Sequence, residues 1–220
     1  MSFYELGRYD LAFREFEQLR KDPSAAPVAC LFLGMIAGKK QHHKEAVALL
    51  ERANGLIERY PSALLALARA HYELRQPGKS EQLLRRLRNL LGLLVADLLE
   101  AGVLYSRLER YGDALEMLNR ARGISPAGAG IACRLAFVLD KLGRTSEALE
   151  ILQQSTKPEL DGECLNLLGQ MAEKGKKLDL ATQALRKAIE IEPDKRRPLP
   201  GPELAVLEPW RQRPFGYGDR

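Results

Sequence analysis

The feature that most constrains this chain is an internal repeat with a period of 34 residues. The clearest copy runs from Val95 to Gly128 and contains two stretches with apolar or small residues at helical spacing. These residues are Leu98, Ala101, Gly102 and Tyr105 in the first stretch, and Tyr111, Ala114, Leu118 and Ala121 in the second, with Pro126 after it. Residues three and four apart lie on one face of a helix. Each copy therefore predicts two short amphipathic helices packed against each other.

Steps of 34 residues in either direction recover the same pattern. The upstream matches are Cys30, Leu33, Gly34, Ala46, Leu50 and Ala53, then Leu64, Leu67, Ala68, Leu84 and Leu87. The downstream matches are Ala132, Leu135, Ala136, Gly143, Ala148 and Leu152, then, shifted by one residue, Leu165, Leu168, Gly169, Ala181, Leu185, Ala188 and Pro193. One copy departs from the pattern, because Ser80 replaces its small alanine. The copies together predict a stacked array in which each helix pair buries its apolar face against the next.

The copy at 95–128 resembles the tetratricopeptide pattern, which is W-x2-L-G-x2-Y followed by A-x3-F and a closing proline. Leu98 replaces the Trp of that pattern and Leu118 replaces the Phe, so both sites stay apolar. The resemblance implies an all-α fold, a right-handed solenoid of antiparallel helix pairs. We expect five units at 27–60, 61–94, 95–128, 129–161 and 162–194, a half unit in 1–26, and a basic, proline-rich tail or linker at 195–220.

The first 26 residues match only half of a unit. Gly7, Tyr9, Ala12 and Phe16 fit the second helix of the repeat, while most of a first helix is missing. A repeat array exposes apolar surface wherever stacking stops, so terminal units normally carry a polar cap. We therefore expect either that this chain is part of a longer protein or that it uses an unusual cap.

Composition, charge and cysteine usage indicate the cellular compartment. Hydrophobic residues make up 45% of the chain and charged residues 29%, and the formal net charge is +5. No secretory signal is visible at the start, and no apolar run is long enough to span a bilayer. The three cysteines, Cys30, Cys133 and Cys164, form no CxxC motif. We expect free thiols in a reducing, cytoplasmic setting, with a disulfide or metal role as the alternative.

The chain carries no recognisable catalytic motif. Phosphate-binding loops, GxGxxG, HExxH and GxSxG are all absent from the sequence, which predicts a non-enzyme without a cofactor. His42 and His43 lie beside lysines in a predicted turn, where solvation is favoured over an anion or metal contact. His71 stands where the family usually has Tyr, so we expect it to pack between helices. Basic residues are scattered among 29 acidic ones, which disfavours nucleic-acid binding.

The family resemblance implies a peptide-binding groove, because in tetratricopeptide proteins the first helices of successive units line a concave surface. The residues expected to face it are Leu31, Met35, Leu65, Arg69, Tyr72, Leu99, Val103, Arg107, Phe137 and Lys141. Apolar side chains there would hold apolar anchors, and Arg69 and Arg107 would pair with a carboxylate. The predicted function is a non-catalytic adaptor whose ligand is an amphipathic, mildly acidic protein segment.

One specific family role is not supported. Tetratricopeptide co-chaperones hold the acidic tail of heat-shock chaperones through a clamp of Lys, Asn and Arg side chains. The corresponding positions here are Leu31, Met35, Ala66, Ala96 and Glu100. A start one unit later also fails to supply the clamp. We therefore predict that this chain is not a chaperone-tail receptor.

The C-terminal residues leave two questions open. Trp210, Phe215 and Tyr217 follow a proline-rich stretch, and they belong either to a disordered tail or linker or to a segment that docks on a partner or on this solenoid. The alternative function is an accessory repeat region of a larger enzyme, such as a bacterial transferase, whose catalytic domain lies outside this chain.

Overall fold

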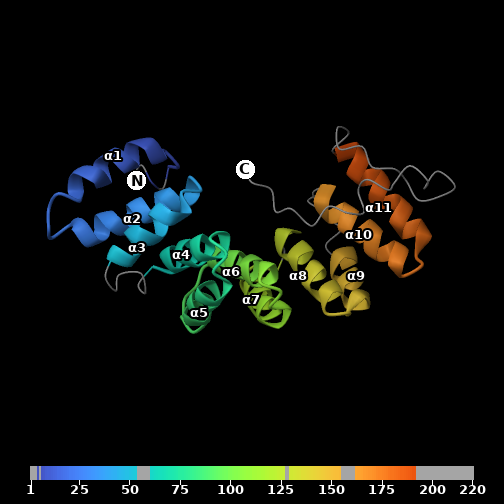
Figure 1. The fold of residues 1–220 in the computed structure, drawn as a ribbon. Helices are drawn as coiled ribbons and strands as arrows, with labels where there is room; N and C mark the ends of the chain where they lie inside the picture. Colours follow the sequence, from blue (N-terminus) through green and yellow to red (C-terminus); the bar gives the residue numbers. More distant parts are fainter. Residues whose placement is uncertain (1–3, 5, 54–59, 127–128, 155–161, 192–220) are drawn as a thin grey trace. The chain divides into compact units, whose positions relative to one another are not determined.

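The computed structural model describes residues 4, 6–53, 60–126, 129–154 and 162–191 (Figure 1). These ranges hold eleven α-helices and no strand. The chain divides into two compact parts, an N-terminal module of Met1–Ile124 and a C-terminal module of Ser125–Arg220. The predicted all-α fold is confirmed.

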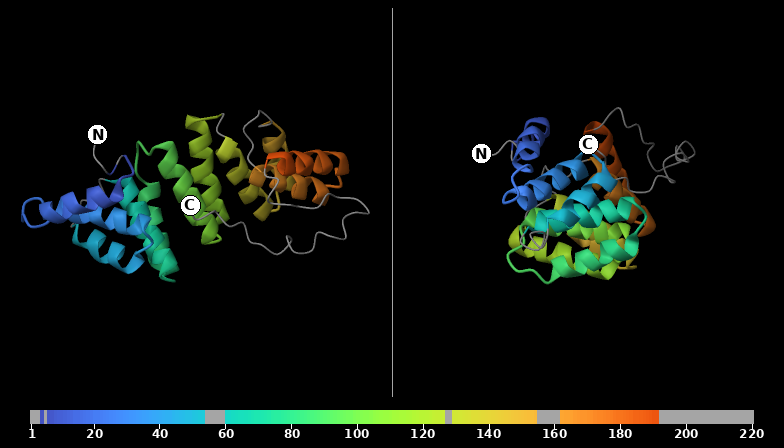
Figure 2. Two further views of the ribbon diagram at one scale, coloured as in Figure 1. Left: turned by 90° about the horizontal axis from the view of Figure 1, so that it is seen from above. Right: turned by 60° about the vertical axis from the view of Figure 1, so that its left-hand side comes forward.

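The N-terminal module contains a single helix followed by three helix pairs. Its helices are α1 (Tyr9–Leu19), α2 (Ala26–Lys39), α3 (His43–Arg52), α4 (Pro61–Glu73), α5 (Pro77–Arg88), α6 (Val95–Arg107) and α7 (Tyr111–Ile124). The pairs α2/α3, α4/α5 and α6/α7 are antiparallel (Figures 1 and 2). Helix α4 also packs on α2, and α6 packs on α4, so the first helices of the pairs lie side by side.

The C-terminal module contains two further pairs. Its helices are α8 (Ala129–Lys141), α9 (Thr145–Gln154), α10 (Gly162–Lys174) and α11 (Leu178–Ile191). Helix α8 pairs with α9 and α10 with α11, and α10 also contacts α8 and α9. None of the helices in the described ranges has the length and apolar character needed to cross a membrane.

The two helices of each pair are joined by the same tight turn. One residue of the turn adopts the left-handed backbone conformation, at φ of 61° for Gln41, 59° for Arg75 and Glu109, 77° for Gly143 and 58° for Lys176. The next residue donates its N–H to the carbonyl five positions back, for example from His42 N to Ala37 O at 2.9 Å. This is the Schellman arrangement, which satisfies carbonyls at a helix end. The turn therefore fixes where each first helix stops.

Close approach within a pair depends on one small residue in the first helix. A Cβ added to Gly34 would lie 2.6 Å from Leu50 Cγ, and one added to Gly102 would lie 2.8 Å from Leu118 Cγ. Gly169 has the same relation to Leu185 Cγ, at 2.7 Å. These distances are shorter than van der Waals contact, so the paired helices come closer than any side chain would permit.

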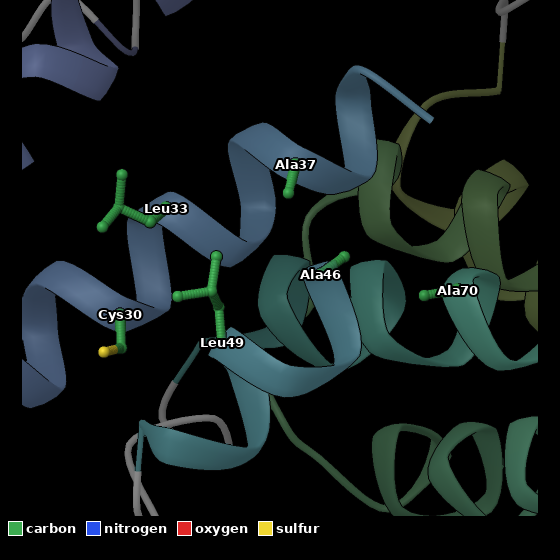
Figure 3. Close-up of a cluster of buried hydrophobic side chains, with 6 residues drawn as sticks. All are labelled: Cys30, Leu33, Ala37, Ala46, Leu49 and Ala70. Carbon is green, nitrogen blue, oxygen red and sulfur yellow. The ribbon is translucent and has the colours of Figure 1, made fainter. Parts of the chain in front are cut away.

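Within the N-terminal module, the core of the first complete pair extends to the next pair. Figure 3 shows a buried cluster of Cys30, Leu33, Ala37, Ala46, Leu49 and Ala70. Five of these residues belong to α2 and α3, whereas Ala70 comes from α4. Phe13 and Phe16 of α1 pack against the same cluster. Helix α1 therefore packs against the core of the first complete pair.

The cysteine prediction is wrong for two of the three residues. Cys133 on α8 and Cys164 on α10 are joined by a disulfide, with their Cα atoms 5.5 Å apart. Cys30 is a free, buried thiol. The pairing was hidden in the sequence because the two cysteines are 31 residues apart and come together only when neighbouring first helices pack.

Candidate peptide-binding groove

A small pocket lies on the face formed by α2, α4 and α6, which we call the first-helix face. Its volume is about 80 Å³. It is lined by Tyr4, Met35, Gly38, Lys39, His43, Ser62, Ala66, Arg69 and Glu100. Three consecutive helix pairs contribute to these walls, so the pocket exists only because the pairs stack.

The two arginines expected to receive a ligand carboxylate already have acidic partners on neighbouring first helices. Arg69 on α4 forms a half-buried, hydrogen-bonded ion pair with Glu100 on α6. Arg107 on α6 donates to Glu73 on α4 at 3.1 Å, and its guanidinium lies 6.0 Å from the ring centroid of Tyr72. A ligand carboxylate would therefore have to compete with Glu100 and Glu73 for these cations.

Aromatic side chains cluster around Phe32, and one of them, Tyr4, also lines the pocket. Phe32 of α2 stacks on Phe16 with ring centroids 4.7 Å apart, and it makes edge contacts with Tyr4 at 5.6 Å and Tyr60 at 6.3 Å. Tyr4 also lies 5.7 Å from Tyr9. Burial, followed by the charges of Tyr9 and Glu100, raises the pKa of Tyr4 to about 12. The phenol therefore stays neutral at physiological pH and can donate a hydrogen bond.

His43 departs from the expected solvated turn. It is the first residue of α3 and is half-buried, and its Nδ1 atom is enclosed without a hydrogen-bond partner among the described residues. The adjacent His42 is exposed, and its Nδ1 lies 3.4 Å from a carboxylate oxygen of Glu45. No group of three or more potential metal ligands occurs within the described ranges.

The structure separates the predicted groove residues by exposure. Leu31 and Leu65 are at most 1% exposed, because each packs into the core between helix pairs, and Met35 is 6% exposed. The partly exposed members in this module are Arg69, Tyr72, Leu99, Val103 and Arg107. Of the predicted residues, only Met35 and Arg69 line the pocket. The apolar strip expected from the sequence is therefore narrower than predicted.

Phe137 and Lys141 belong to the C-terminal module and form a separate local group on α8. The Lys141 ammonium lies 5.6 Å from the ring centroid of Phe137. On the neighbouring α10, Lys174 is ion-paired with Asp140 of α8 at 2.8 Å. Asn166 is 5% exposed, and its Oδ1 has no hydrogen-bond partner among the described residues. Trp210, Phe215 and Tyr217 lie outside the described residues.

Sequence reasoning missed several residues of the pocket. Tyr4, His43 and Glu100 line it, yet the repeat pattern assigned them no role in binding. Glu100 meets Arg69 across an interval of 31 residues, whereas the repeat period is 34. The sequence did contain a signal for this ion pair, namely opposite charges 31 residues apart. That signal is visible only when two successive units are compared.

Comparison with protein families agrees with this architecture. One tetratricopeptide repeat model matches residues 27–60 and 162–195, and another matches residues 105–171. Together these matches cover more than half of the chain. The chain belongs to the tetratricopeptide-repeat family. The resemblance stated from the sequence is confirmed, as is the fold class that it implied.

Solved structures show the same fold at low sequence identity. A structure of MamA aligns with a TM-score of 0.63 and 21% identity, covering 78% of this chain and 99% of that one. A structure of YrrB aligns with a TM-score of 0.64 and 17% identity, covering 82% of this chain and 93% of that one. YrrB is described as a tetratricopeptide-repeat protein with an unusual peptide-binding site. At these identities the likeness concerns the fold alone.

One similar protein is named as an enzyme. The human protein O-mannosyl-transferase TMTC1 is 31% identical over 93 residues, which are 42% of this chain. The matched part is 10% of that protein, so this chain spans a small fraction of its length.

Proposed function

We propose that this chain is a non-catalytic protein-interaction scaffold that binds a peptide segment along the first-helix face of the N-terminal module. The observation that carries the proposal is the pocket to which α2, α4 and α6 all contribute side chains. A peptide lying across several first helices contacts several units at once, so small contacts add up. The peptide-binding relative YrrB is consistent with this function.

The proposed ligand is an amphipathic segment. Its apolar side chains would contact Leu99, Val103 and the aromatic group at Phe32, all of which are partly exposed. A ligand carboxylate would take over a hydrogen bond from Arg69 or Arg107 and displace Glu100 or Glu73. Because each arginine already has a carboxylate partner, we expect acidic residues to contribute selectivity more than affinity.

A charge placed in the groove tests the proposal. Partners of the tagged wild-type chain are captured from the source cells and identified by mass spectrometry, and a peptide from the bound partner is then titrated by fluorescence anisotropy. Val103→Glu buries a charge against the apolar ligand, so its Kd should rise at least about tenfold. The matched control, Asn119→Glu, places the same charge on an exposed position of α7 and should leave the Kd unchanged.

The arginines provide a second measurement with the same peptide. Glu100→Gln frees Arg69 from its carboxylate partner, so an acidic peptide should bind more tightly to this variant than to wild type. Arg69→Glu combined with Arg107→Glu should weaken the same peptide. Equal binding by wild type, Val103→Glu and the double variant would place the site elsewhere and reject the groove.

The C-terminal aromatics are a second proposed contact. Trp210, Phe215 and Tyr217 are aromatic anchors of the kind enriched at interfaces, set in a basic, proline-rich stretch. Alanine at all three positions should weaken capture of a partner that binds through this segment. Retention of every partner by that variant would assign binding to the groove alone.

An accessory role within a larger enzyme is the second candidate function, and the match to a mannosyltransferase favours it specifically. In that case the repeats would hold an acceptor protein near a catalytic domain encoded outside residues 1–220. Sequencing of the complete transcript tests this directly. A reading frame with a transferase domain would support the enzyme, and a frame that contains only repeats would support the adaptor.

A further inference from the structure

The disulfide between Cys133 and Cys164 links the first helices of two consecutive pairs. Their Cα atoms are 5.5 Å apart, a separation that a disulfide can span. Cys133 is 8% exposed and Cys164 is 2% exposed. Both side chains therefore lie at the α8–α10 contact, inside the C-terminal module.

The sequence interval of this pair matches that of a contact in the N-terminal module, although the cysteines lie about one helical turn earlier in their repeat. Arg69 of α4 meets Glu100 of α6 across 31 residues, and Cys133 of α8 meets Cys164 of α10 across the same interval. In both modules, a side chain on one first helix touches a side chain 31 residues later on the next. The stacking of first helices therefore brings the two sulfurs together, and the bond is not needed to place them.

We propose that Cys133 and Cys164 are a reversible redox pair that fastens α10 to α8 when oxidised and releases this link when reduced. The proposal goes beyond the peptide-binding function and does not depend on it. The free thiol of Cys30 sits on α2 in the other module and has no part in the pair.

The oxidant is a low-molecular-weight disulfide such as glutathione disulfide. The thiolate of Cys133, the more exposed of the two, attacks one sulfur of glutathione disulfide, which forms a mixed disulfide and releases one glutathione. The thiolate of Cys164 then attacks the Cys133 sulfur and releases the second glutathione. Two protein thiols and one glutathione disulfide thus become one protein disulfide and two glutathione molecules.

The bond changes the stability of this module through the unfolded chain. It closes a loop that contains all of α9, and a closed loop of that length removes many conformations from the unfolded state. Reduction should therefore lower the Tm of the C-terminal module by about 5–10 °C while the helix pairs stay folded.

Peptide mapping tests the chemistry on the wild-type chain. The protein is equilibrated with glutathione disulfide, alkylated with iodoacetamide in denaturant and digested with trypsin. Cys133 falls in the peptide 123–134, Cys164 in 145–174, where Lys157 precedes a proline, and Cys30 in 22–39. We expect 123–134 cross-linked to 145–174, with 22–39 alkylated. Alkylation of all three peptides without a cross-link would overturn the proposal.

Thermal unfolding with and without the phosphine reductant TCEP tests the consequence. Wild type and the control Cys30→Ser should both lose about 5–10 °C on reduction, whereas Cys133→Ser should be insensitive to the reductant. Because the comparison is made within each protein, a general loss of stability in a variant does not obscure it. An equal Tm for oxidised and reduced wild type would show that the bond does not stabilise the module.

Discussion

Two neighbouring helix pairs of the N-terminal module, α4/α5 and α6/α7, hold equivalent places in the repeat but differ at the residues where their helices meet. In α6/α7 the small residues are Gly102 and Ala114, and the adjoining tyrosine is Tyr105. In α4/α5 the same places hold Ala68, Ser80 and His71, all of them buried. His71 satisfies one ring nitrogen through Gln76 at 2.8 Å, while Ser80 has no partner among the described residues.

The two pairs keep small residues where their helices meet, but the chemical type of the residues at these positions differs. At Gly102 the α6/α7 pair has room only for a hydrogen atom, because the Leu118 side chain occupies the space that a Cβ would need. The α4/α5 pair accommodates the Cβ of Ala68 at the same register with no exposed surface. The period of 34 residues therefore fixes the backbone path, while each pair adjusts its own helix separation.

The largest expected effect is that of Gly102→Ala. The new Cβ would lie 2.8 Å from both Cγ and Cδ2 of Leu118, and Cγ is a branch point that moves only with the whole side chain. We expect a loss of about 2 kcal/mol of unfolding free energy from overpacking, although alanine favours the helix intrinsically. Urea denaturation followed by far-UV circular dichroism measures the change.

Two matched substitutions control this experiment. Gly123 lies in α7, and a Cβ added there would meet nothing within 4 Å, so Gly123→Ala should stabilise the chain by about 0.5–1 kcal/mol. Ala68→Gly in the other pair should cost about 1 kcal/mol through lost helix propensity. Similar values for Gly102→Ala and Gly123→Ala would show that the two pairs do not differ in helix separation.

The next largest expected effect is a gain in unfolding free energy from Ser80→Ala. This substitution gives α5 the alanine that α7 has at the equivalent position, Ala114. The Ser80 hydroxyl is fully buried and lacks a partner among the described residues, so its removal should add about 1 kcal/mol to the unfolding free energy. Ser106→Ala is the contrasting control, because Ser106 donates its hydroxyl hydrogen to the Gly102 carbonyl at 2.8 Å. A loss of stability in Ser80→Ala would reveal a hydrogen bond that the hydroxyl makes in solution.

Tyr105→Phe is expected to show its distinctive effect at alkaline pH. Burial, with Asp113 next, raises the pKa of Tyr105 to about 12, compared with 10.0 in the unfolded chain. Between these pKa values the folded state binds more protons, so stability is intact below pH 10 and falls as the pH rises toward 12. The Tyr105 hydroxyl, like that of Ser80, is buried without a hydrogen-bond partner among the described residues, so the variant should be up to about 1 kcal/mol more stable than wild type at pH 7 and should lose less stability than wild type near pH 11. An identical alkaline decline in both proteins would reject this assignment.

The fold was largely predictable from the sequence because contacts within a pair are local. Gly34 with Leu50 and Gly169 with Leu185 meet 16 residues apart, a spacing that recurs in each copy of the pattern. The turns were predictable for the same reason, since the left-handed residues Gln41, Arg75 and Glu109 follow one another at the repeat period. Local spacing thus carries the information that defines a helix pair.

The site was less predictable, because exposure depends on the next pair along the array. Leu31 and Leu65 were expected to face a ligand, but helix-to-helix stacking buries them. Arg69 with Glu100 and Cys133 with Cys164 meet across 31 residues, whereas Glu73 with Arg107 meet across 34. The 34-residue period alone therefore does not specify which side chains of neighbouring first helices come into contact.

The Schellman turns described above also have a kinetic consequence. Each turn brings two helices together within about 30 residues of chain, so the entropy lost on closing the loop is small and the contacts formed first are local. Folding can therefore begin at any helix pair and spread to its neighbours, as in other linear arrays. During synthesis, which proceeds from the N-terminus, the α2/α3 pair could therefore fold before the cysteines of α8 and α10 have been synthesised.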